Sequence, residues 1–278
     1  MKVLNVNKTK NEIKAGKTYS LVIYTNESNI RNEDLVREVN SWWEYPDKAN
    51  IACIEKLLNI SEKESKKGFG LDFSEIKQGE HLLNTVFDQI NEKDLVSIET
   101  AVFLLDSIYH TRLQSPLRVA NKIHKLFEQE NFLNKIKEAK EQQEIIDCVN
   151  TITNIDKEND TNNNYIYSFA TKFCNRINPR AFPIFDSYVA GLLYRYNRKK
   201  NEFTKTFTQA SLGNYNNFFE TYKHFIDAYQ LSEFDFKKID IFMWTYGKIL
   251  SSKNSNYETN IQLSVKYFMT DEENKRIN

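Results

Sequence analysis

Lys172 and Asp186 are the two side chains whose types and spacing best suit covalent chemistry. They lie 14 residues apart, on either side of an Asn-Pro pair at 178–179, and Lys172 stands in the apolar run 169–174. A lysine withdrawn from water favours its neutral amine, which is a nucleophile. A nearby carboxylate can stabilise the cation that develops as a glycosidic bond breaks. The pair therefore suits displacement at a sugar carbon.

Both residues also have ordinary structural interpretations. On spacing alone, Asp186 is more simply the N-cap of the helix that follows it, and Lys172 is more simply a solvated helix residue. Capping and catalysis are compatible, because the capped helix orients the carboxylate. A buried ion pair of Lys172 and Asp186 that only fixes the helix junction is a further interpretation.

The elements that must position this pair are predicted to be helices. Residues 165–177 have apolar residues at helical spacing, and Asn178-Pro179 stops that helix. A short extended stretch at 182–185 and a second helix at 187–196 follow. This order can bring the lysine of the first helix near the N-terminus of the second.

The rest of the chain is also mostly helical in pattern. Only 7 glycines and 4 prolines occur in 278 residues, which argues against a β-protein rich in turns. We therefore expect a mainly all-α fold. The other candidate helices span residues 32–43, 48–58, 81–90, 96–109, 116–128, 132–155, 215–230 and 237–250.

Three segments are expected along the chain. Residues 1–80 are predicted to form a small N-terminal α/β appendage, with a strand at 19–24, short helices and a charged linker at 60–80. Residues 81–250 form the helical domain, and residues 251–278 form a polar C-terminal tail.

Two segments resemble the helix-hairpin-helix DNA glycosylase superfamily. Thr171-Lys172, an apolar helix and then Pro-x-x-Asp-x-x-Val at 183–189 are similar to the end of the family's hairpin. Residues 103–123 resemble the helix–loop–helix that precedes the hairpin. The two segments occur in the family's order, cover about residues 103–196 together, and are most similar to the 8-oxoguanine DNA glycosylase branch.

The resemblance implies a two-lobed helical domain in which Lys172 forms a Schiff base and Asp186 is essential. It also implies a loop that enters DNA and fills the gap left by an extruded base. The residues of that loop expected to contact DNA are His110, Thr111, Arg112 and Gln114.

The chain departs from the family in several respects. Residues 164–171 contain none of the glycines whose amides usually hold a DNA phosphate, and the spacing from lysine to aspartate is shorter than usual. The four-cysteine iron–sulfur loop of the endonuclease III branch is absent. Three cysteines far apart in sequence predict buried free thiols, with no metal and no cofactor.

Further DNA contacts are expected from a basic and aromatic stretch at 194–200. Arg195, Arg198 and Lys199 would contact phosphates, or would instead form a solvated helix end that suits the helix dipole. Trp244 and Tyr246 are candidates for a base pocket, with core packing as the alternative.

Charge and hydropathy limit the partners and the location. Lys+Arg and Asp+Glu both number 38, so the net charge of zero weakens the case for DNA, although a local basic patch would be enough. No run approaches about 18 apolar residues and the first residues do not resemble a signal peptide. We expect a cytoplasmic monomer without a membrane span.

These features predict a DNA glycosylase that flips a damaged or modified base out of double-stranded DNA, with or without an AP-lyase step. It would serve DNA repair or defence against phage. A non-enzymatic helical module that binds nucleic acid or protein is the main alternative, and a helical scaffold without a ligand is another.

Overall fold

The computed structural model describes residues 73–155, 164–200 and 207–251. These ranges contain nine α-helices, one short 3-10 helix and no strand, which confirms the predicted mainly all-α class. The elements are α5 (Phe73–Asp88), α6 (Leu95–Tyr109), α7 (Pro116–Glu130), α8 (Phe132–Glu138), α9 (Gln142–Thr153), α10 (Asn164–Ile177), α11 (Ser187–Lys200), η1 (Gln209–Gly213), α12 (Tyr215–Ala228) and α13 (Phe236–Ser251).

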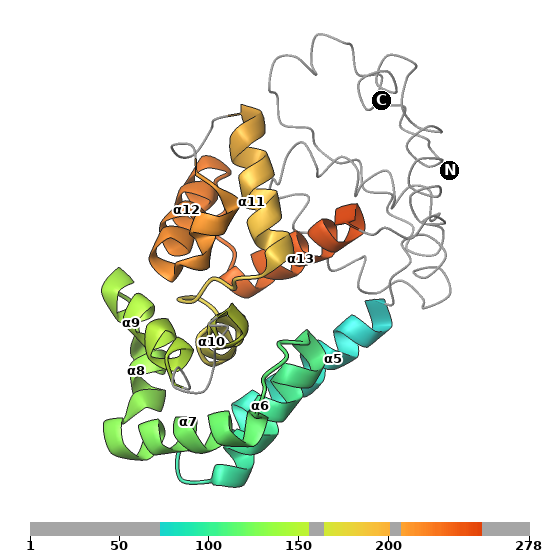
Figure 1. Cartoon of the computed structure of the whole chain (residues 1–278). Coiled ribbons are helices and arrows are strands. Elements are labelled where there is room, and N and C mark those ends of the chain that lie inside the picture. The colour runs from blue at the N-terminus through green and yellow to red at the C-terminus, as the bar shows by residue number, and fades with distance from the viewer. Residues whose placement is uncertain (1–72, 156–163, 201–206, 252–278) are drawn as a thin grey trace.

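Helix α10 has a central position in this arrangement (Figure 1). It packs against α5 and α6 on one side and against α8 and α9 on another, while α11 packs against α12 and α13. All residues of α10 from 169 to 175 are buried, so every face of this part of the helix contacts protein. The helix that contains Lys172 is therefore surrounded by protein.

Phe173 shows how α10 joins its neighbours. Its side chain is fully buried, and its ring meets Phe87 of α5 edge-on at 5.4 Å between centroids. The same ring lies 6.3 Å from Phe127 of α7 and stacks on Phe169 at 5.6 Å. Aromatic packing of this kind fixes the axial position of α10, because close-packed rings leave few alternative arrangements.

Two predicted helix boundaries are wrong. Helix α5 begins at Phe73, eight residues before the predicted start at 81, so the end of the predicted linker is helical. The predicted helix 132–155 is two helices, because Ala139 has an extended ψ of 125° and Glu141 starts α9 with a capping box that uses Glu144.

The predicted strand at 19–24, the helices at 32–43 and 48–58, and the C-terminal tail lie outside the described residues. The α/β appendage therefore stays a prediction. Within the described ranges, every helix is too short or too polar to cross a membrane.

Shortening Phe173 to alanine tests the central packing role of α10. We expect Phe173→Ala to lower the free energy of unfolding by about 3–5 kcal/mol, since it leaves a cavity between three helices. Phe103, which is 44% exposed, is the matched control, and Phe103→Ala should cost within about 0.5 kcal/mol. Urea unfolding measures both, and equal losses would contradict this description of the core.

Candidate active site

Lys172 is buried in α10 with its amine held by neutral oxygens and one carboxylate. The residue is 2% exposed, which is rare for lysine. Its Nζ donates hydrogen bonds to the Ser168 hydroxyl at 2.6 Å and to the Phe185 carbonyl at 3.2 Å. The Ser168 hydroxyl itself donates to the same carbonyl at 3.3 Å. These contacts fix the position of the amine.

Asp186 both caps α11 and pairs with Lys172. Its Oδ1 accepts the Tyr188 amide at 2.9 Å, and its carbonyl accepts the Ala190 amide at 2.8 Å. Its Oδ2 lies 3.5 Å from Lys172 Nζ. The predicted cap and the predicted proximity of the pair are both confirmed, and the cap holds the carboxylate in place for the lysine.

The segment between the two helices is fastened to α10 by side chains of α10. Thr171 accepts the Phe185 amide at 3.1 Å, and the Asn175 amide donates to the Phe182 carbonyl at 2.6 Å. These hydrogen bonds satisfy the backbone of an extended stretch that is mostly buried. Asp186 therefore reaches Lys172 through a rigid connection.

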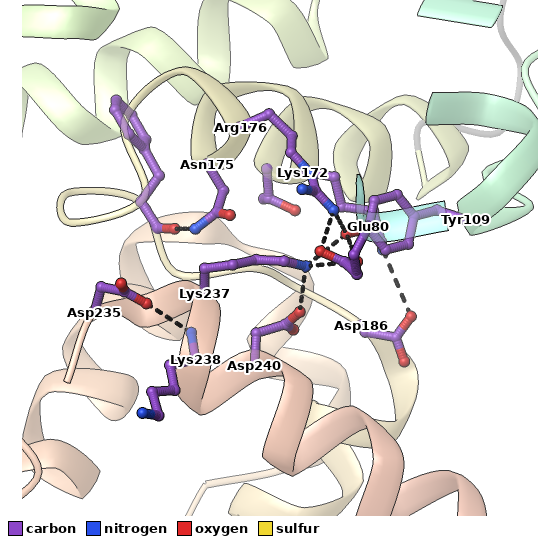
Figure 2. A network of polar contacts seen from close by, with 12 residues as sticks. Glu80, Tyr109, Lys172, Asn175, Arg176, Asp186, Asp235, Lys237, Lys238 and Asp240 are labelled. Atoms are coloured by element: carbon purple, nitrogen blue, oxygen red, sulfur yellow. Dashed lines mark hydrogen bonds and ion pairs between the residues drawn. The ribbon is translucent and has the colours of Figure 1, made fainter. Parts of the chain in front are cut away.

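A second group of polar residues borders Lys172, and we name it the Tyr109 cluster. Its members come from three helices besides α10 (Figure 2) and are Glu80, Tyr109, Arg176, Lys237 and Asp240. Arg176 pairs with Glu80 at 2.6 Å and also donates to the Tyr109 hydroxyl. Lys237 Nζ lies 3.2 Å from Glu80 and 2.6 Å from the Tyr109 hydroxyl. The cluster thus ties α5, α6, α10 and α13 together.

The face of the Tyr109 ring lies close to three basic side chains. The centroid is 5.6 Å from Lys172 Nζ, 5.5 Å from the Arg176 guanidinium carbon and 5.1 Å from Lys237 Nζ. An aromatic face attracts cations. Burial and the Glu80 charge raise the pKa of Tyr109 to about 12, so its hydroxyl stays protonated.

The pKa values of Lys172 and Lys237 shift in opposite directions. Burial lowers the pKa of Lys172, and the attraction of Asp186 and Asp240 does not offset it. Burial also acts on Lys237, but Glu80 and Tyr109 outweigh it and raise the pKa of Lys237. Lys172 is therefore the lysine whose environment favours a neutral amine, as a nucleophile requires.

The loop after α6 is predicted to contact DNA, and the structure divides its residues into two groups. Thr111 is 5% exposed, and its hydroxyl donates to Asp106 Oδ1 at 2.6 Å. The same oxygen accepts the Leu113 amide at 3.0 Å, so Thr111 has an internal role that its sequence position did not indicate. His110, Arg112 and Gln114 are exposed.

The other predicted contact residues lie in α11 and α13. Trp244 is half-buried and packs against the core, which agrees with the core-packing alternative. Arg195, Arg198 and Lys199 are on α11 and Tyr246 is on α13. Their side chains lie outside the described part of the structure, so their contacts stay predictions.

Sequence reasoning missed the whole Tyr109 cluster. A local signal exists for Arg176, which is one helical turn after Lys172, and for Lys237 and Asp240, which are three residues apart in an apolar helix. Their partners are distant, since Arg176 and Glu80 are 96 residues apart. One sequence does not reveal such a pairing.

The two described cysteines agree with the predicted buried free thiols, and Cys53 lies outside the described residues. Cys148 and Cys174 are buried and free, and burial raises the pKa of the Cys148 thiol to about 11. Within the described ranges, no group of three or more metal-ligating side chains is close enough to hold a metal ion.

Comparisons with known proteins cover part of the chain. A family model described as an N-terminal domain matches residues 54–181, which include Lys172 but not Asp186. An uncharacterized protein of Haemophilus influenzae is 40% identical over 92 residues, which are 33% of this chain and 42% of that protein. The chain thus matches less than half of the relative's length. No solved structure matches.

Replacing Glu80 by glutamine tests the electrostatics of the Tyr109 cluster. Removing one partner of a buried ion pair costs about 3–5 kcal/mol. Lys237 and Arg176 outweigh the effect of burial and hold the pKa of Glu80 below 4.5, its ordinary value. The stabilisation that the Glu80 carboxylate gives the fold is therefore complete above pH 4.5, and it is lost as the pH falls through the lower pKa of Glu80 in the folded protein. The free energies of unfolding of wild type and Glu80→Gln should therefore differ by the full amount near neutral pH and become equal in acid.

Urea unfolding across the acidic range measures this convergence. Glu138→Gln is the control, because Glu138 is exposed and its substitution should leave the free energy of unfolding unchanged at every pH. A difference between wild type and Glu80→Gln that stays constant from neutral to acidic pH would contradict the assignment.

Proposed function

We propose that the protein is a DNA glycosylase that removes a damaged or modified base, with Lys172 as the nucleophile and Asp186 as its carboxylate partner. The observation that supports this most is the buried pair itself. Lys172 Nζ lies 3.5 Å from a carboxylate that α11 holds in place, in an environment that lowers the pKa of the amine. A plain solvated lysine would have neither property.

The proposed reaction takes place at C1′ of an extruded nucleotide. The neutral Lys172 amine forms a bond to C1′ while the bond from C1′ to the base breaks, and the base leaves with the electron pair. The Asp186 carboxylate stabilises the positive charge that develops on the sugar. Loss of protons from the nitrogen and opening of the sugar give a Schiff base, from which a lyase step can follow.

The exposed loop residues His110, Arg112 and Gln114 would act near this site. Their loop begins just after Tyr109, whose ring centroid is 5.6 Å from Lys172 Nζ. A side chain that enters the duplex here would extrude a nucleotide close to the lysine. Because Lys172 is 2% exposed, DNA binding must move some of the side chains that cover the amine.

The proposed biological role is either DNA repair or attack on modified phage DNA, carried out by a cytoplasmic monomer. The absence of hairpin glycines at 164–171 favours an unusual way of holding phosphate, for which Arg195, Arg198 and Lys199 are the proposed contacts.

Borohydride trapping tests the role of Lys172. The protein is incubated with duplexes that contain 8-oxoguanine, uracil, a methylated base, 5-hydroxymethylcytosine or an abasic site, and borohydride is then added. We expect a covalent adduct, because borohydride reduces the Schiff base to a stable amine. The adduct should be lost in Lys172→Ala and retained in Lys125→Ala, whose lysine is exposed.

The outcomes of this experiment separate the alternatives. Asp186→Asn should slow base release by roughly 10²–10³-fold, the usual loss for one electrostatic group. Base release without trapping would show a glycosylase that uses water as nucleophile and would contradict the role of Lys172. Neither reaction on any duplex would contradict the enzyme and favour the binding module, with Lys172 and Asp186 as a structural ion pair.

Substitution of Arg112 tests the DNA-contacting loop. If the guanidinium neutralises a phosphate, Arg112→Ala should weaken duplex binding and reduce the slope of log affinity against log salt by about 0.9. Lys137→Ala, which removes an exposed lysine on α8, should leave that slope unchanged. Fluorescence anisotropy at several salt concentrations measures both, and equal slopes for Arg112→Ala and wild type would contradict the contact.

A further inference from the structure

Asp240 is a buried carboxyl group of the Tyr109 cluster, which borders Lys172, and the mechanism above does not use it. We propose that Asp240 is the general acid that protonates the departing base and is reprotonated by the nitrogen of Lys172. This inference rests on the proposed glycosylase function and adds a proton path to it.

The geometry of Asp240 leaves one of its oxygens available. The residue is 4% exposed on α13, and its Oδ2 lies 3.5 Å from Lys237 Nζ. Its Oδ1 is buried and has no hydrogen-bond partner among the described residues. A buried polar atom is normally paired, so an unpaired oxygen in this position suits a group that a substrate completes.

Asp240 lies close to Lys237 and near Asp186. Figure 2 shows the Asp240 carboxyl group below the Lys237 amine, with Asp186 to its right. Lys172 and Asp240 influence each other electrostatically, and Asp186 acts on both. A nucleotide that reaches the Lys172 amine would therefore come near the Asp240 carboxyl group.

The charged and titratable groups around Asp240 come from every neighbouring helix. They are Glu80 of α5, Tyr109 of α6, Lys172 of α10, Asp186 before α11, Tyr222 of α12 and Lys237 of α13. Burial raises the pKa of Asp240 to about 6, although Lys237 and Lys172 act against this rise. Such an acid can both donate and accept a proton near neutral pH.

The other two carboxylates are less suited to this role. Glu80 is bound by Arg176 and Lys237, which lower its pKa. Asp186 accepts the Tyr188 amide that begins α11 and faces Lys172, so its charge serves the sugar cation. Asp240 is the carboxyl group among these three with a buried oxygen that has no partner among the described residues.

The proposed proton transfers neither gain nor lose a proton overall. The Asp240 carboxylic acid gives its proton to the base nitrogen as the bond from C1′ to the base breaks, and the base leaves neutral. The Lys172 nitrogen, now bonded to C1′, carries an extra proton and transfers it to the Asp240 carboxylate. The net change is replacement of one lysine N–H and one C1′–base bond by one base N–H and one C1′–N bond.

The test compares two reactions of the full-length protein. Release of the base is measured on the duplex of the panel that gives the largest yield, and borohydride trapping is measured on a duplex with a preformed abasic site. The first reaction needs a proton for the leaving base, whereas the second has no base to expel. Asp240→Asn should slow base release by about 10²–10⁴-fold and change trapping at the abasic site by much less.

The pH profile provides a readout that a structural role would not change. Base release needs both the acid form of Asp240 and the neutral form of Lys172, so in wild type the slope of log rate against pH should decrease near pH 6, where Asp240 loses its proton. That decrease in slope should be absent in Asp240→Asn and present, at a shifted midpoint, in Asp240→Glu. Asp235→Asn is the control, since Asp235 is exposed, caps the same helix through the Lys238 amide at 2.7 Å and can be replaced by another good capping residue.

Each outcome decides the inference. Wild-type base release and pH profile in Asp240→Asn would overturn the role of Asp240 and leave the glycosylase intact. Equal losses of base release and abasic-site trapping in both Asp240 variants would show a structural role and would also overturn it. If wild type shows neither reaction, the inference fails together with the proposed function.

Discussion

The burial of the Lys172 amine is the constraint on which the rest of the site depends. Removing an ammonium from water is costly, and this protein offsets the cost with two neutral acceptors, Ser168 and the Phe185 carbonyl, and with the Asp186 carboxylate. The compensation is incomplete, so the pKa of Lys172 falls. The same contacts that fix the amine thus favour its reactive form.

The Tyr109 cluster makes this incomplete compensation possible. Lys237 and Arg176 form ion pairs with Glu80, so the charge of this carboxylate is balanced within the cluster. Lys172 instead lies near the Tyr109 ring, and burial raises the pKa of the Asp240 carboxyl group to about 6. Neighbouring groups whose pKa values shift in opposite directions are common where proton transfer occurs.

The sequence predicted the local part of this arrangement well. Helices α10 and α11, the stop at Asn178-Pro179 and the cap at Asp186 all follow from patterns within a few residues. The break at Ala139 was missed, because apolar periodicity continues through it. The cluster was missed for a different reason: Glu80, Tyr109 and Lys237 meet only after α5, α6 and α13 pack around α10, and the Lys237–Tyr109 contact spans 128 residues.

The charge state of the Lys172 amine tests the account most directly. Nitrogen-15 NMR of lysine side chains, with the signal assigned by its loss in Lys172→Arg, would follow the Nζ shift through a pH titration of the protein without DNA. We expect a midpoint below 10.5, the ordinary lysine value, because burial outweighs Asp186 and Asp240. A midpoint at or above 10.5 would mean that Lys172 is an ordinary ion-paired ammonium and would contradict its role as a nucleophile.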